Sequence, residues 1–254
     1  MTAPTFSIRS VSSGGALNQF FPDFQTLNLT PVFCDAGTVA FTYPQNGTNW
    51  SLLHDDLEIA ILLNGVEILE LRSVIESTEG DDASTASDGT VWTYTCRTLL
   101  GRLDEAVIYP PLWPITDPVK HTYVSSNAGK IIGDFVGYAH TRGSLAWLSI
   151  DFTSTHDSAG ATWLNPIDMV FNVGVKYSDM VKSLVDASVV EVRIQGRTLQ
   201  AFNVDTLGTD KTTGTSPLRF IKGRDLKESP RKSSTRDLST VTLLAGYNLS
   251  LIHI

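Results

Sequence analysis

The sequence predicts a mixed, β-rich (α+β) protein, and three features support this prediction. Short runs of β-branched and aromatic residues, separated by turn residues, fill most of the N-terminal part of the chain. One stretch, 126–143, carries a strong helical pattern, and strand-like and helix-like segments then alternate. We therefore expect an N-terminal antiparallel β-barrel-like domain (1–110), a central α+β domain (111–204), and a connector with the first strands of a further β-domain (205–254).

The first domain is expected to consist of short strands joined by tight turns. Strand-like runs occupy 24–33 and 38–43. Within 57–76, two apolar segments meet at Asn64-Gly65, a dipeptide that favours the type I′ turn of a β-hairpin. Large apolar and polar residues alternate along 90–99, which is the pattern of a half-buried strand.

Two segments stand out by their composition. The segment 80–89 contains no apolar residue larger than alanine, so we expect it to project as a polar loop. Four prolines interrupt the strand pattern between Tyr109 and Lys120 and mark the boundary between the first two domains: Pro110, Pro111, Pro114 and Pro118.

The helix predicted at 126–143 is the element around which the second domain is organised. Ser126 or Asn127 can cap its start, and Gly143 supplies a left-handed stop. One apolar stripe runs along it: Ala128, Ile131, Ile132, Phe135, Val136 and Ala139.

Glycines recur at every fourth position of this helix, at Gly129, Gly133 and Gly137. A glycine costs a helix up to about 1 kcal/mol relative to alanine, so three of them indicate a close approach. We expect this row to pack against another backbone, in a strand or in a neighbouring subunit. Accordingly, Gly133→Leu is predicted to lower the melting temperature or to block assembly.

The remainder of the second domain is expected to contain a strand, a helix and a hairpin. The strand is placed at 145–152, and the helix at 178–186 with Ser178 as its N-cap. The hairpin is placed at 190–202, around Gly196-Arg197.

Beyond residue 204 the chain becomes polar and then basic. Two short strands are predicted there, at 218–221 and 240–244, and basic residues outnumber acidic ones in 217–254. This basic part is interpreted as a solvated connector or, alternatively, as a surface complementary to an acidic neighbour. The last six residues, LSLIHI, resemble the translation of a sequencing adapter, so we expect a C-terminally truncated metagenomic fragment.

Composition excludes several classes of protein. A chain of 254 residues that is 42% hydrophobic and 18% charged can bury a large core and is not of the disordered type. Its net charge of −8 argues against a protein that binds along nucleic-acid phosphates, and we expect no sequence-specific nucleic-acid partner. It has no secretory signal and no apolar run long enough to span a membrane, so we expect no stable membrane insertion. Cys34 and Cys96 lie in apparent strands without a CxxC motif and are expected to be small buried hydrophobes.

No constellation of residues predicts catalysis or ligand binding. His54-Asp55-Asp56 and His156-Asp157 lack a second histidine at ligand spacing. The carboxylates considered for glycoside cleavage, Asp151, Asp157 and Asp168, show no arrangement that separates them from surface acids, and there is no GxSxG motif. We therefore predict no catalytic, cofactor-binding or metal-binding residue, no cofactor and no enzymatic activity.

Two segments resemble a known family. The first is AGKIIGDFVGYAHTRG followed by WLSIDF and HDSAGATW, and the second is VGVKYSDMVKSLVDASVVEVRIQGRTLQAFN. Together with the flanking CRTLLGRLDEAVIYP and KESPRKSSTRDLSTVTLLAG, they are similar to minor tail or tail-hub (baseplate hub) proteins of long-tailed, siphovirus-type bacteriophages, especially those of actinobacteria. The resemblance spans roughly residues 91–246 and is a pattern of elements rather than of invariant chemistry.

The resemblance implies a structural protein of the virion tail tip that is assembled in the host cytoplasm. Such hub proteins form a ring, commonly a trimer, that caps the tail tube, joins it to tip or fibre proteins and surrounds the tape measure protein. One alternative is a receptor- or carbohydrate-binding tail protein that uses Trp50, Trp92 and Trp113 as a platform. A second alternative is a tail-associated cell-wall hydrolase.

Overall fold

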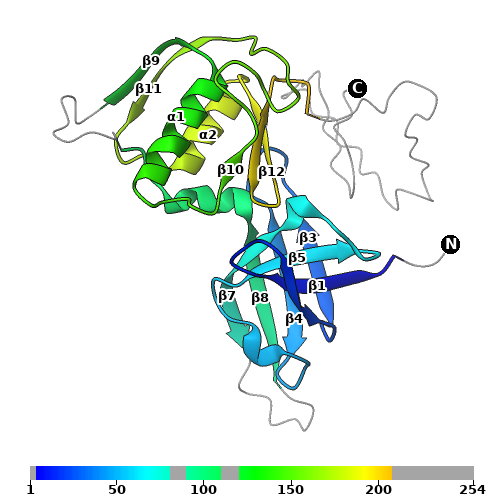
Figure 1. Cartoon of the computed structure of the whole chain (residues 1–254). Helices are drawn as coiled ribbons and strands as arrows, with labels where there is room; N and C mark the ends of the chain where they lie inside the picture. The colour runs from blue at the N-terminus through cyan, green and yellow to red at the C-terminus, as the bar shows by residue number, and fades with distance from the viewer. Residues whose placement is uncertain (1–3, 81–89, 110–119, 208–254) are drawn as a thin grey trace, which may run out of the picture. The chain divides into compact units, whose positions relative to one another are not determined.

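The computed structural model describes residues 4–80, 90–109 and 120–207 (Figure 1). Met1–Val204 form one compact unit, distinct from Asp205–Ile254. Within this unit, residues 4–98 form a β-half and residues 99–204 form an α/β-half. The strands and helices of the two halves confirm the predicted β-rich α+β class.

The β-half is one large antiparallel sheet with the strand order β2-β1-β5-β7-β8-β4-β3, in which β6 also pairs with β5. Its edge strands β2 and β3 follow each other along the chain but are not paired within the described residues, so the sheet curls without closing into a barrel. The bounds are β1 Phe6–Val11, β2 Leu17–Phe21, β3 Thr26–Thr30, β4 Thr38–Pro44, β5 Glu58–Leu63, β6 Val66–Glu67, β7 Ser73–Gly80 and β8 Val91–Thr98.

One hydrophobic core fills the curled sheet. Phe21 on β2 meets Tyr43 on β4 edge to face, with ring centroids 6.0 Å apart, and so bridges the gap between the two ends of the sheet. Phe41 stacks on Tyr94 with centroids 5.0 Å apart. Because side chains from both ends and the middle of the sheet share this core, apolar burial holds the curl together.

The hairpin turn predicted at Asn64-Gly65 is confirmed, since both residues have positive φ (52° and 81°). The arm after the turn differs from the expectation of one continuous strand. It divides into β6 and β7 around a short 3-10 turn at Leu69–Leu71. The Leu69 carbonyl accepts a hydrogen bond from the Gly196 amide at 3.1 Å, so this interruption serves a contact with the α/β-half.

The α/β-half packs two helices against two small sheets. The sheets are β10-β13-β12, in which β10 runs parallel to β13, and the two-stranded antiparallel pair β11-β9. The bounds are a 3-10 helix at Leu99–Glu105, β9 Lys120–Ser126, α1 Ala128–Thr141, β10 Ser149–Ile150, β11 Ile167–Asn172, α2 Tyr177–Asp186, β12 Glu191–Gln195 and β13 Thr198–Phe202.

Helix α1 forms as predicted. The Asn127 side chain accepts the Lys130 amide at 2.8 Å as an N-cap, and Gly143 adopts a left-handed conformation with φ 78° after the last turn. The six predicted stripe residues are all buried. Phe135 lies at the centre of an aromatic cluster that includes Tyr123, Phe171 and Tyr177.

Three predicted details are wrong. The strand expected at 145–152 shrinks to β10, because Leu145 has φ 52° and opens a turn closed by the Leu148 amide. Ser178 lies inside α2, whose N-cap is Lys176, and its hydroxyl donates to Asp104 instead of capping. Cys34 sits in a turn with φ 54° rather than in a strand.

Several predictions fall outside the described residues. They concern the loop at 81–89, most of the proline-rich boundary and the strands at 218–221 and 240–244. The C-terminal LSLIHI also lies outside this range. The division at residue 110 therefore stays a prediction.

Candidate functional site

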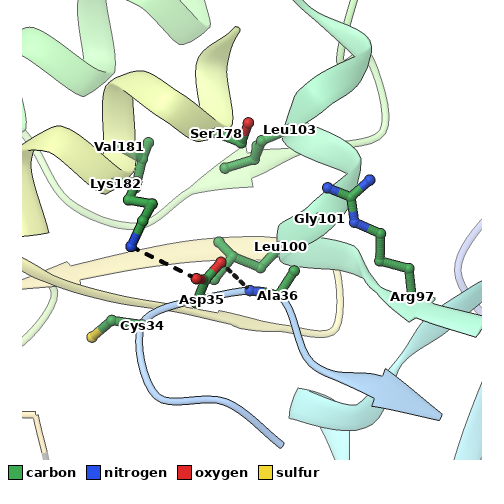
Figure 2. A pocket seen from close by; sticks show the side chains of 10 residues that line it. All are labelled: Cys34, Asp35, Ala36, Arg97, Leu100, Gly101, Leu103, Ser178, Val181 and Lys182. Atoms are coloured by element: carbon green, nitrogen blue, oxygen red, sulfur yellow. Dashed lines mark hydrogen bonds and ion pairs between the residues drawn. The ribbon is translucent and has the colours of Figure 1, made fainter.

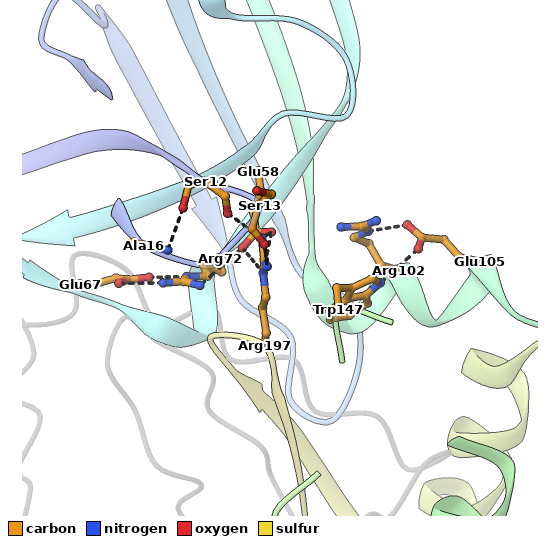
Figure 3. A network of polar contacts seen from close by, with 10 residues as sticks. All are labelled: Ser12, Ser13, Ala16, Glu58, Glu67, Arg72, Arg102, Glu105, Trp147 and Arg197. Atoms are coloured by element: carbon orange, nitrogen blue, oxygen red, sulfur yellow. Dashed lines mark hydrogen bonds and ion pairs between the residues drawn. The ribbon is translucent and has the colours of Figure 1, made fainter. Parts of the chain in front are cut away.

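The most elaborate polar arrangement in the described residues joins the two halves, and Arg197 is at its centre (Figure 3). Arg197 lies in the turn between β12 and β13 and reaches the β-half. Its Nη2 donates to Glu58 Oε2 at 2.8 Å, and its Nε donates to the same oxygen at 3.1 Å. Nη2 also donates to the Ser12 carbonyl at 2.9 Å, and Nη1 donates to the Ser13 carbonyl. The planar guanidinium thus holds a strand and a loop of the β-half at once.

The partner carboxylate belongs to a buried ionic network within the β-half. Glu58 is 6% exposed and Arg72 is 7% exposed. Arg72 Nη1 lies 3.5 Å from Glu58 Oε1, and its Nε lies 2.6 Å from Glu67 Oε1. Two guanidinium groups therefore alternate with two carboxylates, which offsets the cost of burying each charge alone.

A second polar link between the halves centres on Asp104 in the 3-10 helix. It accepts from Arg97 at 2.8 Å, from Lys176 at 3.4 Å and from the Ser178 hydroxyl. Desolvation acts to raise the pKa of Asp104, but the hydrogen bonds from Ser178 and Arg97 outweigh it and hold that pKa below its usual range. The carboxylate is therefore a fixed anion that ties β8 to α2.

The cavity beside this link is small (Figure 2). Its volume is about 30 Å³, which is space for a water molecule and far below the several hundred Å³ of typical ligand pockets. Lys182 and Asp35 approach each other at its rim, at 3.9 Å. The cavity is therefore a packing gap at the junction of the halves.

Both cysteines are free thiols. Cys34 Sγ accepts the Val192 amide of β12 at 3.3 Å, and burial raises the pKa of this thiol to about 11 despite that hydrogen bond. Burial also raises the pKa of Cys96, which packs in the core of the β-half. Neither thiol has the lowered pKa of a reactive cysteine.

Asp157 is buried, and here the expectation of a surface acid is wrong. The residue is 3% exposed, and its carboxylate accepts hydrogen bonds from the amides of Ala159 (3.0 Å) and Ala161 (2.8 Å) and from Asn203 Nδ2 (2.8 Å). Desolvation opposes ionisation, but the hydrogen bonds from Asn203, Ala161 and Ala159 lower the pKa of Asp157. This carboxylate organises the turn at 157–161 and fastens it to the end of β13.

The other polar candidates do not come together. Asp151 accepts from Gln200 Nε2 at 2.6 Å, and Asp168 accepts the Ser125 amide at 2.7 Å. His54 contacts the Asp55 carbonyl at 2.7 Å, while His156 contacts the Thr155 hydroxyl at 2.9 Å. In the part of the chain that the structure describes, no three His, Cys, Asp or Glu residues are grouped as a metal site.

The fold has relatives among solved structures. Prophage tail protein gp18 from Listeria monocytogenes EGD-e matches 80% of this chain with a TM-score of 0.52 and 11% sequence identity. The chain shares its fold with this prophage tail protein. A prophage MuSo2 43 kDa tail protein from Shewanella oneidensis matches 83% of the chain with a TM-score of 0.47 and 10% identity. The chain spans about half the length of these proteins, 52% and 58% respectively. No family model and no curated protein matches it.

The glycine row of α1 only partly meets the expectation. A Cβ at Gly129 would collide with the Thr153 carbonyl and the Trp163 indole, so close backbone approach is confirmed there. At Gly133 a Cβ would meet only Ile150 Cδ1, at 3.9 Å, and at Gly137 it would meet nothing within 4 Å among the described residues. Gly133 instead borders a shallow groove of about 160 Å³ between α1 and the segment 150–154.

The tryptophans considered for a binding platform occupy different surroundings. Trp50 and Trp92 are half-buried against the core of the β-half, with ring centroids 6.3 Å apart. Trp113 lies outside the described residues. The two described indoles therefore serve packing, and no exposed aromatic platform is built from them.

The junction at Arg197 was not predicted from the sequence. The only local signal was the Gly196-Arg197 pair at a hairpin tip, and nothing around Glu58 distinguishes it from other strand carboxylates. Neither helix of the described residues has the length and apolarity that a membrane crossing requires.

Proposed function

We propose that this chain is a structural, non-enzymatic protein of a bacteriophage tail. The observation that carries the proposal is the fold likeness to prophage tail protein gp18, which extends over 80% of the chain. The resemblance of 91–246 to tail-hub proteins comes from the sequence and is independent of that likeness.

The more specific proposal is a tail-tip or baseplate hub of a siphovirus-type phage, close to those of actinobacteria. In this role the protein forms a homo-oligomeric ring, a trimer, that caps the tail tube and connects it to tip or fibre proteins. Its further neighbours would be the distal tail and the tape measure protein. It would act at the virion tail tip after assembly in the host cytoplasm, without a cofactor and without sequence-specific contacts to nucleic acid.

The junction between the halves supports a mechanical role. A ring subunit must present its two contact surfaces in a constant relative orientation, because an angular error in each copy prevents closure. Arg197 holds Glu58 and two carbonyls, and Asp104 holds three donors. Charge-assisted hydrogen bonds of this kind are directional, so they resist rotation of one half against the other better than apolar contact alone.

The alternatives receive less support. A carbohydrate-binding role needs exposed aromatic faces, whereas Trp50 and Trp92 are half-buried. A hydrolase needs a pair of carboxylates free to act on a substrate, whereas Asp157 is fully engaged with the turn at 157–161.

Immunogold electron microscopy of the phage that encodes the chain tests the proposal. Antibodies against the protein are expected to label one end of the tail, distal to the capsid. Labelling of the capsid, or no labelling of purified virions, would overturn the assignment. Clearing of host cell walls by the purified chain would overturn its non-enzymatic part.

A further inference from the structure

The chain contains two Asn-Gly dipeptides, Asn46-Gly47 and Asn64-Gly65, and both lie in turns of the β-half. In such a dipeptide the glycine amide nitrogen can attack the side-chain carbonyl carbon of the asparagine, because glycine has no side chain to block the approach. The two groups are neighbours along the chain, so the reaction is intramolecular and has a high effective concentration. The dipeptides are chemically alike, and their surroundings in the fold set them apart.

At Asn64-Gly65 the attacking nitrogen is free. The strand pairing of the hairpin ends where Leu63 lies opposite Val66, so the turn consists of these two residues alone. Within the described residues the Gly65 amide donates no hydrogen bond, and a Cβ on Gly65 would meet nothing within 4 Å. Both turn residues are exposed. The Gly65 amide proton is therefore open to removal by hydroxide from the solvent.

The side chain of Asn64 is held by its oxygen. Asn64 Oδ1 accepts the Thr5 amide at 3.0 Å, and the Asn64 amide donates to the Thr5 carbonyl at 2.8 Å. This contact occupies neither the carbon that is attacked, Cγ, nor the leaving group, Nδ2. As a nitrogen adds to Cγ, negative charge develops on Oδ1, and a donor already in contact with that oxygen stabilises the charge. The Thr5 amide therefore favours the attack.

At Asn46-Gly47 the attacking nitrogen is engaged. The Gly47 amide donates to the Pro44 carbonyl at 2.9 Å, and the Gly47 carbonyl accepts the Trp50 amide at 3.1 Å. A Cβ on Gly47 would come within 2.5 Å of Cε1 of the fully buried Tyr43. Attack by this nitrogen requires breaking its hydrogen bond to Pro44 and moving the peptide away from the Tyr43 ring, both of which cost free energy.

We propose that Asn64 is a site of spontaneous deamidation in the folded protein and that the fold protects Asn46 from the same reaction. The Gly65 nitrogen gives its proton to hydroxide and bonds to Asn64 Cγ. The Cγ–Nδ2 bond breaks, and Nδ2 takes up a proton from water and leaves as ammonia. Water then opens the cyclic imide, at Cγ to give aspartate or at the Asn64 backbone carbonyl carbon to give isoaspartate. In total one water is consumed, one ammonia is released and one negative charge is gained. This reaction does not depend on the proposed tail function.

Peptide mapping by mass spectrometry tests the site. The full-length folded protein is incubated at pH 6 and pH 8 in water enriched in oxygen-18, so that deamidation during the incubation carries the label. Labelled product at Asn64 is expected to form at least about fivefold faster than at Asn46, since one hydrogen bond contributes a factor of this size. Both rates are expected to be higher at pH 8, where more hydroxide is present to remove the amide proton. Equal rates at the two sites, or a faster reaction at Asn46, would overturn the inference.

The same chain unfolded in urea is the control for the sequence around each site. There both asparagines are expected to react at similar rates, because the hydrogen bond of Gly47 and its packing on Tyr43 are gone. An undiminished preference for Asn64 in urea would mean that the neighbouring sequence selects the site, and it would contradict protection by the fold.

A matched pair of variants gives a second measurement. Asn64→Gly leaves a Gly-Gly turn, which also suits this type of hairpin, and Asn46→Gly makes the equivalent change at the other site. Each product of deamidation is more acidic than the parent protein, so ion-exchange chromatography separates them. Wild type and Asn46→Gly are expected to accumulate the acidic form at the same rate, and Asn64→Gly at least about fivefold more slowly. An Asn64→Gly chain that becomes acidic as fast as wild type would refute the assignment to Asn64.

Discussion

Arg197 and Glu58, 139 positions apart in the sequence, form the charged contact that locks the β12-β13 turn onto β5, with Arg197 Nη2 2.8 Å from Glu58 Oε2. Glu58 is almost fully buried and also lies beside Arg72. The orientation of the two halves therefore depends on a directional charge pair as well as on apolar packing.

Arg197→Met is expected to lower the free energy of unfolding by about 3 kcal/mol. The loss arises because the buried Glu58 carboxylate loses its closest charged partner and keeps only Arg72, at 3.5 Å. Urea unfolding of the full-length chain measures the effect. Lys182→Ala is the matched control, since Lys182 pairs with Asp186 and Asp35 at exposed positions and such pairs contribute about 1 kcal/mol or less.

The double variant Arg197→Met with Glu58→Met measures the direct interaction between the two side chains. Because it removes the carboxylate together with its guanidinium partner, it is expected to lose less unfolding free energy than the two single variants lose in sum. Strict additivity in the same urea series would contradict a direct interaction between the two side chains.

Asp157→Asn is expected to destabilise the protein at pH 7 by about 2 kcal/mol, because an amide replaces a carboxylate that accepts several hydrogen bonds. The folded-state pKa of Asp157 is lowered. Its contribution is therefore fully present above the unfolded-state value of about 3.9 and is lost as the pH falls through the lower folded-state pKa.

The measurement for Asp157 is the difference in unfolding free energy between wild type and variant at pH 7, 5 and 3. A difference that is constant between pH 7 and 5 and shrinks at pH 3 is expected. Asp186→Asn, at an exposed position on α2, is the control. A difference that grows toward acid pH would refute the role assigned to the carboxylate.

Elements with strong local signals could be predicted from the sequence. The turn at Asn64-Gly65 needs positive φ at both residues, which this dipeptide adopts readily. Helix α1 combines an apolar stripe with an N-cap and a glycine stop, and each of these signals lies within 126–143. The β-rich class followed for the same reason, since alternation and turn residues are local properties.

The parts that could not be predicted depend on residues far apart in the chain. Ser178 has the chemistry of an N-cap, but Asp104, 74 positions away, takes its hydroxyl. Asp157 is held in a buried position by Asn203, 46 positions away, so the residues around it in the sequence give it the pattern of a surface acid. Nothing within 57–76 shows that Leu69 must turn to meet Gly196.

Asn127→Ala is expected to lower the free energy of unfolding by about 1 kcal/mol. The substitution removes the acceptor for the Lys130 amide and the donor to the Ser154 carbonyl. Asn127→Asp keeps the cap and is expected to recover most of the loss. Asn28→Ala, on the exposed face of β3, serves as the control. Equal thermal stability of Asn127→Ala and wild type would show that the cap contributes little.

Gly129→Ala and Gly137→Ala are expected to change the stability of the protein in opposite directions, although both glycines belong to the same row on α1. A methyl group at Gly129 meets the Thr153 carbonyl and the Trp163 indole, and the indole is itself fixed by a 2.9 Å hydrogen bond to that carbonyl. Forcing this contact apart is expected to cost about 1–3 kcal/mol. At Gly137 nothing described lies within 4 Å, so alanine is expected to stabilise the helix by up to about 1 kcal/mol. The melting temperatures of both variants, measured against wild type at low protein concentration, test this expectation. A lower melting temperature for both variants would mean that Gly137, too, faces a backbone.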